Sequence, residues 1–113
     1  MPEASILPAL MDVIADRKTN PPAERSYVVS LLNGGTGKIG SKITEEAGEV
    51  VEAADEPGQA GREHLVHEVA DLLFHTLVLL GLKDIPWSEV EAELGRRFGV
   101  GGIVEKESRG KTE

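Results

Sequence analysis

The sequence contains no cysteine and few aromatic residues, and its acidic side chains outnumber its basic ones. The absence of cysteine excludes disulfides, thiolate zinc sites and a cysteine nucleophile, and it fits a reducing environment such as the cytoplasm. With 20 acidic and 12 basic residues, the net charge is −8, which argues against nucleic acid as a partner because that binding needs a basic surface. The same charge argues against docking on an anionic membrane.

No apolar run is long enough to cross a membrane. The most apolar stretch, residues 72–82, has about half of the roughly 20 residues that a span needs, and His75 interrupts it. The N-terminus has no basic region ahead of an apolar run, so it does not read as a signal peptide. We therefore expect a soluble, cytoplasmic protein.

Alternating apolar and polar residues, the pattern of a half-buried strand, are also missing, and helical spacing predicts an all-α bundle of four to five helices. The expected helices cover residues 4–18, 26–32, 38–55, 62–82 and 88–97, and the Gly-rich run 33–38 is expected to be a loop. The helix at 62–82 is apolar nearly all round, which predicts either the centre of a bundle or a subunit interface. Residues 1–98 form the expected domain, and 99–113 form a Gly-rich tail.

Two acidic pairs lie in consecutive long helices, Glu46 with Glu49 and Glu68 with Asp71. Each pair is spaced i, i+3, so its two carboxylates share one helix face. If the helices pack side by side, four carboxylates meet, and charges that close disfavour ionisation unless a cation separates them. Oxygen ligands favour Mg²⁺, or Mn²⁺, over zinc or iron. The alternative, for the acids of the first pair taken alone, is a solvated helix face.

A metal held by these carboxylates would suit a phosphate-bearing substrate, and a Gly-rich run with lysine residues precedes the first acidic pair. The run Gly34-Gly-Thr-Gly-Lys38 fails the Walker pattern, because Ile39 follows the lysine where serine or threonine is needed. A Gly-rich loop that leads into a helix can still meet an anion through free N–H groups, and a plain turn is the alternative. Lys38 and Lys42 would then be the cations nearest the acids.

His75 lies one turn beyond Asp71 on the same helix face, which makes it the histidine best placed to contact a substrate. The other histidines suit ordinary surface or capping roles. The tail carries basic residues that could fold over a phosphate, although a Gly-flanked terminus is mobile by default. These tail residues are Lys106, Arg109 and Lys111.

The order of several short motifs resembles the phosphoribosyl-ATP pyrophosphatases, a family of the all-α nucleotide pyrophosphatase superfamily. The motifs are Arg17-Lys18, Ser26-Tyr27, Lys38, Lys42-Ile-Thr-Glu-Glu46-Ala-Gly-Glu49-Val-Val51, Glu68-Val-Ala-Asp-Leu-Leu-Phe-His-Thr-Leu-Val-Leu-Leu80 and Arg97-Phe-Gly-Val-Gly-Gly-Ile-Val-Glu-Lys106. The acidic pairs are generic to the superfamily. The Ser-Tyr pair and the Gly-Ile-x-Glu-Lys-x-Ser-Arg tail narrow the resemblance to this family.

The resemblance implies a bundle that forms a homodimer or higher oligomer, which suits the apolar fourth helix. It implies Mg²⁺-dependent hydrolysis of phosphoribosyl-ATP to phosphoribosyl-AMP and pyrophosphate, the second step of histidine biosynthesis. The implied metal ligands are Glu46, Glu49, Glu68 and Asp71, and Glu45 is an extra ligand or the base that activates water. The implied substrate contacts are Lys18, Tyr27, Lys38, Lys42, Lys106 and Arg109.

Two other functions stay open. The same helices suit a housekeeping nucleoside triphosphate pyrophosphatase that acts on another base or sugar. They also suit a non-enzymatic helical dimerisation module whose acidic rows are only solvated. Comparing turnover of phosphoribosyl-ATP with turnover of ordinary deoxynucleotides tests the first alternative. The second predicts that Mg²⁺ causes no shift in thermal stability.

Overall fold

The computed structural model describes residues 5–99, in which there are four helices and no strand. The expected all-α bundle is therefore confirmed. Lys106 and Arg109 lie outside the described residues. The helices are α1 (Leu7–Thr19), α2 (Tyr27–Ala54), α3 (Gly58–Leu82) and α4 (Trp87–Phe98).

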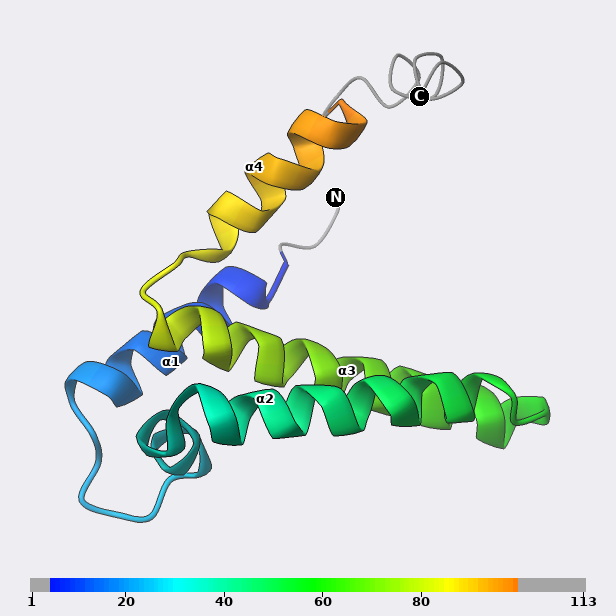
Figure 1. Cartoon of the computed structure of the whole chain (residues 1–113), viewed down its shortest axis with the longest axis horizontal. Helices are drawn as coiled ribbons and strands as arrows, with labels where there is room; N and C mark the ends of the chain where they lie inside the picture. Colours follow the sequence, from blue (N-terminus) through cyan, green and yellow to red (C-terminus); the bar gives the residue numbers. More distant parts are fainter. Residues whose placement is uncertain (1–4, 100–113) are drawn as a thin grey trace.

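The second half of α2 and α3 form an antiparallel hairpin, which is the long axis of Figure 1. Only residues 55–57 connect the two helices, and α3 begins at Gly58, four residues earlier than the sequence predicts. The tight connection depends on Gly61, because a Cβ there would collide with the main-chain carbonyl of Glu56. A short connection fixes which residues of the two helices lie opposite each other, and so it fixes where their acids meet.

The prediction of a loop at residues 33–38 is wrong, because α2 continues through this run with a sharp kink. Only Gly35 leaves the helical region, with φ 71° and ψ −167°, a conformation that glycine adopts at little cost. The two halves of α2 consequently point in different directions (Figure 1). Lys38 Nζ donates to Ser30 Oγ across the kink, at 2.7 Å.

The core lies where α1, α2 and α3 meet. Gly81 allows α1 to cross α3 closely, because a Cβ there would lie 2.5 Å from Ile14 Cγ2. The α4 helix packs on α1 and projects away from the hairpin (Figure 1). The fully buried large side chains are Ile14, Leu31, Ile39, Leu77 and Val78.

By length and composition alone, α3 could cross a membrane. It instead packs against α1 and α2, and its buried polar residues Glu68 and His75 suit the central helix of a soluble protein. Part of its apolar surface is uncovered in the single chain, since Val66 is 66% exposed and Val69 43%. That dimers form through α3 remains a prediction.

Candidate metal centre

Three of the four predicted metal ligands converge between α2 and α3. The ligand oxygen atoms of Glu46, Glu49 and Glu68 all lie within 4.8 Å of one another. Glu46 and Glu68 are buried, each only 8% exposed, and Glu49 is half-buried. Helical spacing aligns Glu46 with Glu49, and the tight α2–α3 connection brings Glu68 opposite them. We refer to these three residues as the carboxylate cluster.

One oxygen of the carboxylate cluster has no partner. Glu68 Oε1 is buried without a hydrogen bond, whereas Glu68 Oε2 lies 3.0 Å from His64 Nε2. A buried carboxylate oxygen without a partner is costly. A cation in the cluster would satisfy it, and hard oxygen ligands of this kind fit Mg²⁺.

The electrostatics of the cluster lead to the same requirement for positive charge. The pKa of Glu49 is raised, chiefly by the adjacent Glu68 carboxyl, then by desolvation and by the negative charges of Glu68, Glu45 and Glu46. Ionised carboxylates this close repel one another, and the repulsion makes Glu49 harder to ionise. A metal ion bound between the carboxylates would relieve this repulsion.

Asp71, the fourth predicted ligand, does not join the carboxylate cluster. Its Oδ2 lies 3.2 Å from His67 Nε2, and its carboxylate groups instead with His67 and Glu68. Glu68 therefore belongs to both groups of potential ligands. Glu45 lies at the edge of the site, with 57% of its side chain exposed and Lys42 Nζ 3.7 Å away.

His75 is buried against the carboxylate cluster and is only 5% exposed. Its Nδ1 lies 2.5 Å from Glu46 Oε1 and 2.9 Å from the Asp71 carbonyl oxygen. Its Nε2 lies 2.8 Å from the Tyr27 hydroxyl. The structure thus brings two predicted substrate contacts, Tyr27 and His75, to the site, but the buried imidazole is occupied by protein groups.

His64 contacts the site although the sequence assigned it no function there. Its Nδ1 lies 2.9 Å from both carboxylate oxygens of Glu56, and its Nε2 reaches Glu68. These two hydrogen bonds, first that to Glu56 and then that to Glu68, raise the pKa of His64. The i, i+4 spacing of His64 and Glu68 could have predicted their contact, because residues four apart on a helix share one face. The Glu56 contact depends on the tight connection, which the sequence did not predict.

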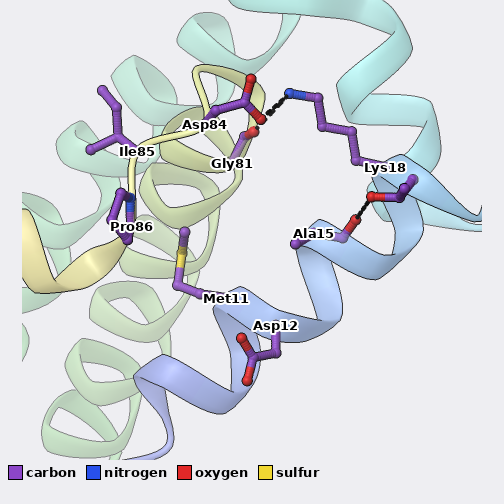
Figure 2. A pocket seen from close by; sticks show the side chains of 9 residues that line it. Met11, Asp12, Ala15, Lys18, Gly81, Asp84, Ile85 and Pro86 are labelled. Atoms are coloured by element: carbon purple, nitrogen blue, oxygen red, sulfur yellow. Dashed lines mark hydrogen bonds and ion pairs between the residues drawn. The ribbon is translucent and has the colours of Figure 1, made fainter.

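Lys18 lies away from the carboxylate cluster. Its Nζ donates to the carbonyl oxygens of Gly81 and Leu82, at 3.2 and 3.0 Å, and to Asp84 Oδ1 at 2.7 Å. These acceptors use all three ammonium donors. Figure 2 shows Lys18 beside a cavity of about 280 Å³ between α1 and the end of α3. The spacing from Glu68 to Gly81 corresponds to about 20 Å of helix, so this cavity is separate from the cluster.

Comparison with known proteins identifies the family. A sequence model described as phosphoribosyl-ATP pyrophosphohydrolase matches residues 7–98, most of the chain. The chain belongs to the phosphoribosyl-ATP pyrophosphohydrolase family. The resemblance seen in the motifs is therefore confirmed, and the part matched to this family includes all four helices and the carboxylate cluster.

Relatives of the phosphoribosyl-ATP pyrophosphohydrolase family match along nearly their whole length. A protein of Rhodopirellula baltica named phosphoribosyl-ATP pyrophosphatase is 50% identical over 111 residues, covering 96% of this chain and 91% of the relative. The protein of that name from Geotalea daltonii is 54% identical over 92% of this chain and 94% of its own. The protein of that name from Neisseria meningitidis serogroup B is 47% identical, over 93% of this chain and 94% of its own length.

Proposed function

We propose that this protein hydrolyses phosphoribosyl-ATP to phosphoribosyl-AMP and pyrophosphate, with Mg²⁺ held by Glu46, Glu49 and Glu68, and by Asp71 once its carboxylate turns away from His67. The observation that carries the proposal is the carboxylate cluster with its unpartnered buried oxygen, in a member of this family. When bound, Mg²⁺ would neutralise charge on the phosphate oxygens during transfer to water. Mn²⁺, with the same preference for oxygen ligands, is the alternative ion.

The roles of the remaining residues follow from where they lie. Glu45 is exposed beside the cluster and is our candidate for the base that orients the attacking water. Lys42 and Lys38 lie on the same helix as Glu46, and to contact phosphate oxygens they would have to leave their present partners, Glu45 and Ser30. For Lys18 to contact substrate, it would first have to leave its three oxygen partners. The last two proposed substrate contacts are the tail residues Lys106 and Arg109.

The decisive experiment is an assay of pyrophosphate release from phosphoribosyl-ATP, with Mg²⁺ and with a chelator. We expect activity only with the metal. Glu46→Gln should lower it by roughly 100-fold or more, because loss of a ligand should exceed the about 10- to 100-fold loss typical of residues that support ligands. Glu52→Gln is the matched control, because Glu52 is an exposed acid of α2 outside the cluster.

The same assay separates the alternative substrates. Deoxynucleoside triphosphates should be poor substrates, and faster turnover of these than of phosphoribosyl-ATP would favour the housekeeping pyrophosphatase. Activity that survives the chelator, or an active Glu46→Gln variant, would refute the proposed metal centre. Family membership already speaks against a non-enzymatic dimerisation module.

We further propose that the protein acts in the cytoplasm as a homodimer or higher homo-oligomer. The support is the uncovered apolar surface of the hairpin, with Val66 and Val69 on α3 and Val51 on α2 exposed. Exposed apolar patches of this kind mark association surfaces. Sedimentation velocity of the native chain and of a Val66→Lys variant tests this, and a native protein that sediments as a monomer would contradict it.

A further inference from the structure

We propose that His75 is a positioning residue for the metal centre. In this proposal its Nδ1–H holds the Glu46 carboxylate in place, and the Tyr27 hydroxyl fixes the tautomer that allows this. This inference depends on the proposed function in one respect, namely that Glu46 is a metal ligand. The three residues come from the first turn of α2, its second half and the C-terminal half of α3.

The contacts of His75 assign its protons. Nδ1 faces two groups, Glu46 Oε1 at 2.5 Å and the Asp71 carbonyl oxygen at 2.9 Å. An ionised carboxylate and a carbonyl can only accept, so Nδ1 carries the proton. In a neutral imidazole Nε2 is then an acceptor, and the Tyr27 hydroxyl at 2.8 Å donates to it. Donation therefore runs from Tyr27 to His75 and from His75 to Glu46.

Burial strengthens this chain of hydrogen bonds. His75 and Glu46 are both buried, so little water competes for either group. The rings of Phe74 and Tyr27 lie edge-to-face with the imidazole, with centroids 5.0 and 5.7 Å from its own. A charge-assisted hydrogen bond in such surroundings is stronger than one in water. Glu46 is consequently held in one conformation before any ion arrives.

A held carboxylate is a better ligand for two reasons. One hydrogen bond leaves the other lone pairs of the Glu46 carboxylate for a cation. A side chain that is already fixed also loses less conformational entropy when the ion binds. Residues that support metal ligands in this way typically change metal affinity by about 10- to 100-fold.

The test is calorimetric titration of the full chain with Mg²⁺ in the absence of substrate. His75→Leu removes the donor and should weaken Mg²⁺ binding by roughly 10- to 100-fold. His75→Asn places an amide nitrogen near the Nδ1 position and should recover most of the loss. Tyr27→Phe deletes only the hydroxyl and should have a smaller effect. The control is Thr76→Val, which removes a hydrogen bond to the Leu72 carbonyl on the same helix and should leave affinity unchanged.

Two further measurements distinguish positioning from a general structural role. In the pyrophosphate-release assay, His75→Leu should raise the Mg²⁺ concentration needed for half-maximal rate, while kcat at saturating Mg²⁺ changes much less. Nitrogen NMR of the native protein should show His75 protonated at Nδ1 and not at Nε2. Loss of folding alone would not produce this split or this tautomer.

Unchanged Mg²⁺ affinity in a folded His75→Leu variant overturns the inference, and so does a proton on Nε2. If His75→Leu does not fold, His75→Asn and His75→Gln decide, because glutamine places its nitrogen near Nε2 instead. The inference requires the Asn variant to bind Mg²⁺ more tightly than the Gln variant, and equal affinities refute it. A native protein that binds no Mg²⁺ refutes the metal centre as well, whereas failure of the variants alone leaves the proposed function standing.

Discussion

Replacing Glu68 by glutamine should stabilise the metal-free protein. Glu68 and Glu46 are both buried, and their ligand oxygens lie within 4.8 Å of each other. At this separation and an effective dielectric constant of about 20, two unit charges repel by about 3.5 kcal/mol. Glutamine keeps an acceptor for His64 and removes the charge. Because loss of the charge also weakens the hydrogen bond to His64, we expect a gain of about 1–3 kcal/mol in the free energy of unfolding.

The same substitution should abolish the response to Mg²⁺. An ion present at 100 times its Kd stabilises a folded protein by about 2.7 kcal/mol, provided that it binds only the folded state. The native protein should gain this amount, and Glu68→Gln should not, because one clustered carboxylate is gone. The variant should therefore be more stable than the native protein without Mg²⁺ and lose that advantage with it.

Thermal unfolding followed by circular dichroism, at one protein concentration and with chelator or Mg²⁺, measures both effects. In a domain of this size 1 kcal/mol shifts Tm by roughly 4–8 °C, so the expected gain is readily seen. The control is Glu63→Gln, which changes an exposed acid of α3 that contacts Gln59 at 3.1 Å. It should change stability by no more than about 0.5 kcal/mol. A Glu68→Gln variant less stable than the native protein in chelator would refute the reasoning.

The remaining predictions concern the scaffold. Gly81→Ala should lower the free energy of unfolding by roughly 1–3 kcal/mol, because its Cβ would meet the buried Ile14. Gly40→Ala, with open space around it, should add up to about 1 kcal/mol, and chemical denaturation measures both. The two arginines that follow Glu93 on α4 lower its pKa from the ordinary 4.5. A pKa that is lower in the folded state stabilises that state at pH values above the unfolded pKa. The stabilisation is lost as the pH falls through the folded pKa. The difference in Tm between native protein and Glu93→Gln should thus close below pH 4.5, and a constant difference would contradict it.

The helices were predictable where apolar residues recur at helical spacing, but their boundaries were not. The expected start of α3 was four residues late, because Gly58 and Gly61 look like turn residues in a sequence. In the structure Gly61 is instead a helical residue whose missing Cβ makes room for the Glu56 carbonyl. A glycine that ends a helix and a glycine that allows a close approach look the same in a sequence. Only the tertiary contact distinguishes them.

The acidic pairs were predictable because i, i+3 spacing fixes a shared face on any helix. The spacing does not fix which acids meet across two helices. That choice depends on the register set by the connection at residues 55–57 and on side-chain partners such as His67, which holds Asp71 outside the carboxylate cluster. The structure accordingly separates Asp71 from Glu46 and Glu49, whereas the sequence predicted that all four carboxylates meet in one pocket.

The kink at Gly35 links the scaffold to the site. Along a straight helix, Tyr27 and Glu46 would be about 28 Å apart, yet both contact the imidazole of His75. The kink at Gly35, where φ is 71° and ψ is −167°, turns the first half of α2 back so that both reach His75. The glycine run at residues 34–38, which resembles a phosphate loop in the sequence, therefore shapes the site by forming the kink in α2. It brings the start of α2 to His75, and the imidazole in turn contacts the cluster through Glu46.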